Sequence, residues 1–143
     1  MHTQPKSFSE MTPGTELGPL RLTVSAAANQ RYWQAAGVDH PALRAGALYP
    51  PIAANLTVLC FRQVCPEPVI QTRQKLRCHR RADAGVELVT RGRVVARYEK
   101  RGRTYVDVET IVETAAETDG ETGGLLWTSE VSFTPAADVG AGS

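Results

Sequence analysis

The fold is decided by residues 49–64, Tyr49-Pro-Pro-Ile-Ala-Ala-Asn-Leu-Thr-Val-Leu-Cys-Phe-Arg-Gln-Val64. From Ile52 to Phe61 the side chains are apolar apart from Asn55 and Thr57, and a helix of this kind must be covered on nearly every side. The two prolines suit its first turn, where a missing N–H has no intrahelical partner. We therefore predict a buried helix over Ile52–Val64.

Downstream of this helix the sequence alternates between apolar and polar residues, a pattern typical of strands with one buried face. It predicts four strands, at residues 71–80, 86–98, 104–114 and 125–134. Upstream it predicts a short strand at 20–24 and a helix at 26–36, with Ser25 as the N-cap. We expect an α+β protein in which an antiparallel sheet wraps around one long buried helix.

The composition is that of a single globular domain. With 143 residues, a net charge of +1 and 22% charged residues, the chain resembles ordinary soluble proteins. No apolar run reaches the roughly 20 residues that span a bilayer, and the N-terminus lacks a signal-peptide core. We therefore expect a cytoplasmic protein with a loose N-terminal arm at residues 1–19, one domain at 20–135 and a flexible tail at 136–143.

The cysteines and histidines indicate neither disulfides nor a metal. Three cysteines are an odd number without framework spacing, so reduced thiols are expected. No histidine forms a ligand pair with them, so no zinc and no other cofactor is expected. No nucleic-acid recognition module accompanies the arginine-rich strands, so nucleic acid is not an expected partner.

The order of short strand, helix, loop, buried helix and four strands is similar to the hot-dog fold. The segments Tyr32–Pro41, Leu48–Pro51 and Arg81–Gly85 more narrowly resemble the MaoC-like family of (R)-specific enoyl-thioester hydratases and dehydratases. The first segment is similar to the active-site signature Tyr-x-x-Ala-x-Gly-Asp-x-Asn-Pro-x-His. The resemblance covers residues 20–135 and implies a hydro-lyase of fatty acid or polyketide metabolism, acting on a 3-hydroxyacyl or 2-enoyl thioester of coenzyme A or an acyl carrier protein.

The sequence departs from this family at each catalytic position. In the family an Asp and a His move a proton on and off one water, and a glycine N–H at the helix start polarises the thioester carbonyl. Here Val38 stands in place of the Asp, Leu43 in place of the His, and Pro51, which has no N–H, in place of the glycine. The tandem prolines instead resemble the non-catalytic subunit of heterodimeric dehydratases, whose partner supplies the Asp and His.

Two enzymatic alternatives remain open. Asp39 and His40 form the one adjacent acid–base pair near the expected site, so a self-sufficient lyase with a rebuilt site would use them as catalytic residues. Against this, the pair is also typical of an ordinary loop turn. A thioesterase, the third hypothesis, would depend on Asp39, the sole acid between Gly18 and Glu67.

Several residues are candidates for binding the thioester. If strands 71–80 and 86–98 pair, their outward arginines form one positive patch for the phosphates of coenzyme A or an acidic carrier protein; the alternative is a solvated strand face. A hot-dog sheet exposes an edge, so a homodimer or a heterodimer with another hot-dog subunit is expected. The candidate substrate-binding residues are Tyr49, Pro51, Ile52, Asn55, Arg77 and Arg93.

Overall fold

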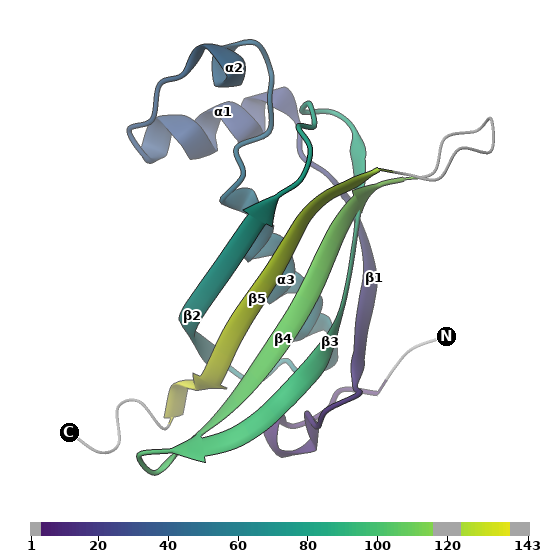
Figure 1. Ribbon diagram of the computed structural model, residues 1–143, viewed down its shortest axis with the longest axis vertical. Coiled ribbons are helices and arrows are strands. Elements are labelled where there is room, and N and C mark those ends of the chain that lie inside the picture. The colour runs from purple at the N-terminus through teal and green to yellow at the C-terminus, as the bar shows by residue number, and fades with distance from the viewer. Residues whose placement is uncertain (1–3, 116–123, 138–143) are drawn as a thin grey trace.

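The computed structural model describes residues 4–115 and 124–137. The chain forms a short 3₁₀ helix and then strands and helices in the order shown in Figure 1. These are η1 (Phe8–Glu10), β1 (Glu16–Thr23), α1 (Ala26–Ala35), α2 (Pro41–Arg44), α3 (Ile52–Val64), β2 (Val69–Cys78), β3 (Glu87–Lys100), β4 (Arg103–Thr114) and β5 (Leu125–Pro135).

The strands form one antiparallel sheet in the order β1-β3-β4-β5-β2, which curves around α3. This arrangement confirms the predicted α+β architecture, and α3 has the predicted bounds. Figure 1 shows α1 and α2 together at one end of the molecule, beyond the first turn of α3. The sheet therefore buries α3 and leaves its N-terminal end facing α1 and α2.

The core lies between α3 and the concave face of the sheet. Phe61 on α3 stacks on Phe133 of β5, with ring centroids 4.5 Å apart. The strand predicted at residues 104–114 has its valines on the buried face, because Val106, Val108 and Val112 are all buried. The helix is not covered all round, however, since Leu59 is 47% exposed.

The N-terminal segment corrects the prediction of a loose arm over its described part. Phe8 and Met11 are buried in the core, and β1 begins at Glu16 rather than near residue 20. The Arg97 guanidinium lies over the Phe8 ring and donates hydrogen bonds to the Phe8 and Met11 carbonyls, at 2.7 and 3.3 Å. Two apolar residues in a polar segment thus attach it to the domain. Residues 138–143 of the predicted tail lie outside the described residues.

The segment between α1 and α3 was predicted to be a loop, but it contains the short helix α2. His40 precedes Pro41 and is extended, with φ −147° and ψ 139°. Its Nδ1 accepts a hydrogen bond from the Ala42 N–H, and Pro41 occupies the first turn, where proline is tolerated. A side-chain cap and a proline therefore form one helical turn in a segment without apolar periodicity.

Candidate functional site

A largely apolar cavity of about 570 Å³ lies beside the start of α3. Its walls come from the α2 segment, the residues that lead into α3, the end of β2 and the turn after it, and Trp127 of β5. The main lining residues are Val38, His40, Leu43, Leu48, Tyr49, Pro50, Cys78, His79 and Trp127. A cavity of this size and polarity is typical of a small-molecule site with few polar groups.

Asp39 and His40 do not face the same space. The imidazole of His40 borders the apolar cavity, where its Nδ1 is occupied by the Ala42 N–H at 3.1 Å. Asp39 borders a separate hollow between α1 and α2, and its carboxylate lies 3.4 Å from the Arg44 guanidinium. Both residues are exposed. The structure therefore brings His40 to the cavity and leaves Asp39 outside it.

The start of α3 has its backbone N–H groups either missing or occupied. Pro50 and Pro51 have none. The Ile52 and Ala53 N–H groups donate to the carbonyls of Tyr49 and Pro50, each at 3.0 Å. An oxyanion site needs N–H groups aimed at the developing charge. This helix start offers no such donor from residues 50–53.

The backbone just before α3 is held by Asn29 of α1, a residue that no sequence pattern marks. Its amide nitrogen donates to the Ala47 carbonyl and its amide oxygen accepts from the Tyr49 N–H, both at 2.9 Å. Asn29 is 2% exposed, so both of its hydrogen bonds replace lost contacts with water. The Leu48 N–H donates to the Ala82 carbonyl at 2.9 Å. These contacts fix the cavity wall that contains Tyr49.

The remaining candidates at α3 lie in three different environments. Tyr49 is half-buried and lines the cavity, whereas Ile52 is buried in the core. Pro51 is exposed. Asn55 is also exposed and donates to the Tyr32 hydroxyl at 3.1 Å. Of these candidates, the structure brings Tyr49 to the cavity that His40 borders.

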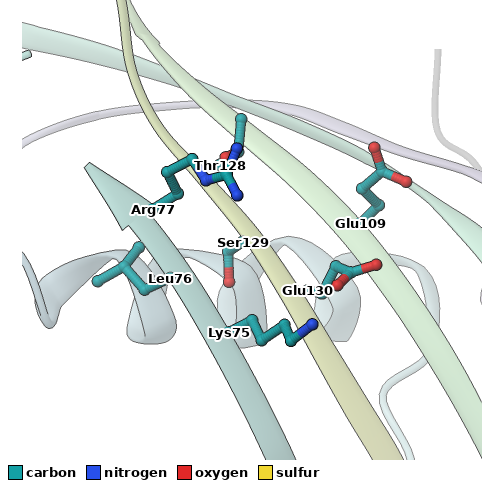
Figure 2. Close-up of a pocket in the computed structure, with 7 residues that line it drawn as sticks. All are labelled: Lys75, Leu76, Arg77, Glu109, Thr128, Ser129 and Glu130. Atoms are coloured by element: carbon teal, nitrogen blue, oxygen red, sulfur yellow. The ribbon is translucent and has the colours of Figure 1, made fainter. Parts of the chain in front are cut away.

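Arg77 and Arg93 do not form a shared patch, because β2 and β3 are not neighbours. Strands β4 and β5 lie between them. The sheet register sets Glu130 and Glu109 between Lys75 and Arg93, and it sets Thr128 and Ile111 between Arg77 and Arg91. Figure 2 shows Arg77 on the outer face beside Thr128, whereas Glu130 lies next to Lys75 and Glu109 lies farther across the sheet. The prediction of one positive patch is therefore wrong, since it assumed that strands adjacent in sequence pair in the sheet.

Figure 2 also shows a second hollow, of about 520 Å³, on this outer face. It is lined by Lys75, Leu76, Arg77, Glu109, Thr128, Ser129 and Glu130. The hydroxyl of Ser129 is buried, and the described residues offer it no hydrogen-bond partner. The hollow mixes cations and carboxylates on a sheet surface and has no histidine, so the apolar cavity beside α3 is the stronger candidate site.

Several cavity residues could not be assigned from sequence patterns. His79 falls within the strand predicted at residues 71–80, but β2 ends at Cys78 and the next residues turn toward the cavity. The His79 ring is held by Thr128, with Nε2 and Oγ1 2.9 Å apart. Trp127 carried no signal beyond its place in a predicted strand.

The buried cysteines are not reactive groups of this site. Burial raises the pKa of the Cys60 thiol to about 11, and burial also raises the pKa of Cys65. A thiol is nucleophilic as the thiolate, so Cys60 is inert near neutral pH. Cys78, by contrast, is exposed and lines the cavity.

None of the described helices is long and apolar enough to cross a bilayer.

Neither a protein-family model nor a curated protein sequence matches this chain, but solved structures share its fold. A chain of the C-terminally truncated HadBC (3R-hydroxyacyl-ACP dehydratase) complex from Mycobacterium tuberculosis is 17% identical, with a TM-score of 0.69 over 87% of this chain and 97% of that one. The R-hydratase PhaJ1 from Pseudomonas aeruginosa is 18% identical, with a TM-score of 0.70 over 90% and 84%.

The ChsH1-ChsH2 complex from Mycobacterium tuberculosis contains a further match, 12% identical, with a TM-score of 0.68 over 87% of this chain and 98% of that one. Identities this low show the fold alone. The described elements, with five antiparallel strands curved around α3, agree with it. This chain has the hot-dog fold, and its structural neighbours include an R-hydratase, a MaoC-like dehydratase and a subunit of a 3R-hydroxyacyl-ACP dehydratase complex.

Proposed function

We propose that this chain is a catalytically incomplete acyl-thioester-binding subunit of a hot-dog hydratase or dehydratase. It pairs with a second hot-dog subunit that supplies the acid–base residues. The substrate class is a 3-hydroxyacyl or 2-enoyl thioester on coenzyme A or an acyl carrier protein.

The observation that carries the proposal is the lack of a free backbone N–H group at residues 50–53, where α3 starts. A hydratase must stabilise negative charge on the thioester oxygen, and this helix start has two prolines followed by N–H groups that already donate to Tyr49 and Pro50. Val38 and Leu43 line the cavity where the resemblance expects the catalytic carboxylate and imidazole. Oxyanion donor, base and acid are thus all replaced in one place.

The same cavity remains suited to bind an acyl chain. Apolar side chains from α2, from the lead-in to α3 and from β5 surround it, and burial of a short acyl group there is favourable by about 0.8 kcal/mol per CH₂. The exposed residues Arg80 and Arg81 also line it. The Arg80 guanidinium suits a phosphate, whereas that of Arg81 lies 3.2 Å from the Asp83 carboxylate. In this proposal the chain orients the thioester and its partner performs the proton transfers.

Binding is tested with a saturated acyl-CoA, which cannot be hydrated. Trp127 lines the cavity, so its fluorescence in a Trp33→Phe background should change saturably as butyryl-CoA is added. Ala42→Phe, which adds a ring to the cavity wall, should weaken that binding at least tenfold, whereas free coenzyme A should bind much more weakly than the thioester. No saturable signal with butyryl-CoA would contradict the proposed acyl site.

A self-sufficient lyase is the second candidate, and the position of His40 favours it. The His40 ring borders the cavity, so with Nδ1 accepting from Ala42 its Nε2 would carry the exchangeable proton. Such an enzyme would hydrate an enoyl-CoA alone and would lose this activity in His40→Ala. Asp39→Ala is the matched control, because Asp39 borders a different hollow and its loss should leave a His40-based reaction intact.

A further inference from the structure

The edge strand β2 is an open pairing surface in the described structure. It hydrogen-bonds to β5 on one side, and none of the described strands lies along its other side. Along its ten residues, all but Val69 and Leu76 are exposed. A long, exposed edge strand presents unpaired N–H and C=O groups to another chain.

The outward side chains of β2 carry charges of one sign. Arg73, Lys75 and Arg77 alternate along the strand and face Ser132, Glu130 and Thr128 of β5. Figure 2 shows Lys75 and Arg77 on the outer face, with Leu76 turned to the other side. In the part of the chain that the structure describes, no ion pair within 4.0 Å involves any of these three cations.

Pairing β2 with β2 of a second copy would oppose these charges. In an antiparallel pair that keeps the outer faces aligned, a register centred on Lys75 sets Lys75 against Lys75 and Arg73 against Arg77. Shifting the register by two residues in either direction still sets one cation against another. Like charges directly opposite on neighbouring strands destabilise the pair, whereas opposite charges stabilise it.

The other edge of the sheet is not a suitable partner for β2. Strand β1 contains Pro19, which cannot donate a backbone hydrogen bond, and its register shifts between Leu17 and Leu20. Its Arg21 is also engaged within the sheet, where it forms an ion pair with Glu87 of β3 at 3.0 Å. An open-ended polymer, in which β2 of one copy pairs with β1 of the next, is therefore not favoured.

We propose that β2 selects, by charge, a partner whose antiparallel edge strand carries carboxylates on the outer face of the sheet, and that it disfavours pairing with itself. The inference rests on the proposed function, because it specifies the surface of the second hot-dog subunit. The row of cations supplies discrimination, since it opposes one partner and attracts another.

The test uses this chain as its own probe. A triple variant, Arg73→Glu, Lys75→Glu and Arg77→Glu, presents the acidic edge that the proposal requires. Parent, variant and an equimolar mixture are compared by sedimentation velocity over a range of concentrations at low salt. The mixture should associate at least tenfold more tightly, about 1.4 kcal/mol, than either protein alone. Added salt should reduce the difference, because exposed charges are screened within about 8 Å at 0.15 M.

The matched control reverses three exposed cations on a strand inside the sheet. Arg91→Glu, Arg93→Glu and Lys100→Glu on β3 make the same change in net charge away from the edge, so this triple variant should not associate with the parent. A neutral triple variant, with Gln at 73, 75 and 77, should associate with itself more tightly than the parent does. Thermal melting confirms that each variant is folded before the comparison.

Three outcomes would overturn the proposal: a parent that dimerises as tightly as the mixture, a control variant that binds the parent equally well, or a mixture that stays monomeric. An acidic acyl carrier protein that binds the parent, and not the triple edge variant, would assign the surface to the carrier if the mixture stays monomeric. Since no thioester is used to measure association between the copies, this result is independent of the acyl-CoA binding test.

Discussion

The two sides of α3 differ in what they contribute to the protein. Leu56 faces the sheet and is 1% exposed, whereas Leu59, less than one turn later, is 47% exposed. Both are leucines in the same apolar helix, so composition alone does not distinguish them. The difference teaches that this apolar helix has one side that determines stability and another that is exposed, while the candidate cavity lies beside its N-terminal end.

The largest effect is expected on the buried side. Leu56→Asp places an unpaired charge among Leu88, Val112 and Leu126, in addition to the loss of a buried side chain that alone costs about 2–5 kcal/mol. Because domains of this size are stable by about 5–15 kcal/mol, the variant should be unfolded. Circular dichroism during thermal unfolding measures this. Leu59→Asp is the matched control and should change stability by less than about 0.5 kcal/mol; equal melting of the two variants would refute the contrast.

An intermediate effect is expected at Asn29, which connects α1 to the backbone before α3. Asn29→Ala leaves the Ala47 carbonyl and the Tyr49 N–H without their partner and should destabilise by about 1–3 kcal/mol. Binding of butyryl-CoA should also weaken, because Tyr49 forms part of the cavity wall. Denaturant unfolding and the Trp127 fluorescence titration measure the two effects. Asn55→Ala, which removes one surface hydrogen bond to Tyr32, should alter stability little.

A smaller effect, without a change in stability, is expected from the cysteines. At pH 8 a maleimide should modify the exposed Cys78 and leave the buried Cys60, whose pKa is raised to about 11, as an unreactive thiol. Reaction at Cys60 should increase only as the pH approaches that value. Since Cys78 lines the cavity, butyryl-CoA should slow its modification, as measured by mass spectrometry. Faster labelling of Cys60 than of Cys78 would place the thiols in environments opposite to those described.

The sequence predicted the elements that depend on local patterns. The bounds of α3 follow from its apolar run and prolines, and the inward valines of β4 follow from alternation. Pairing across the sheet could not be obtained in this way, because strands adjacent in sequence need not be neighbours, and β2 lies beyond β5. Phe8 and Met11 are too few to produce a periodic signal, although both are buried.

The candidate site was predictable only in part, for the same reason. Tyr49 and His40 come from the segments that carry the family resemblance, and both line the cavity. Trp127 and His79 reach it from elements far along the chain, and Asn29 acts through backbone groups 18 and 20 residues away. A sequence pattern reports the residues of one segment, whereas a cavity wall is assembled by the fold.

The central claim, that the chain binds acyl thioesters but does not complete the reaction, is tested most directly by hydration of a short enoyl-CoA. The purified chain is incubated with crotonyl-CoA, and loss of the enoyl absorbance is followed alongside the His40→Ala variant. We predict that parent and variant show equally negligible hydration, because the start of α3 offers no oxyanion donor and no carboxylate borders the cavity among the described residues. Robust hydration by the parent that is lost in His40→Ala would contradict the account and identify a self-sufficient enzyme.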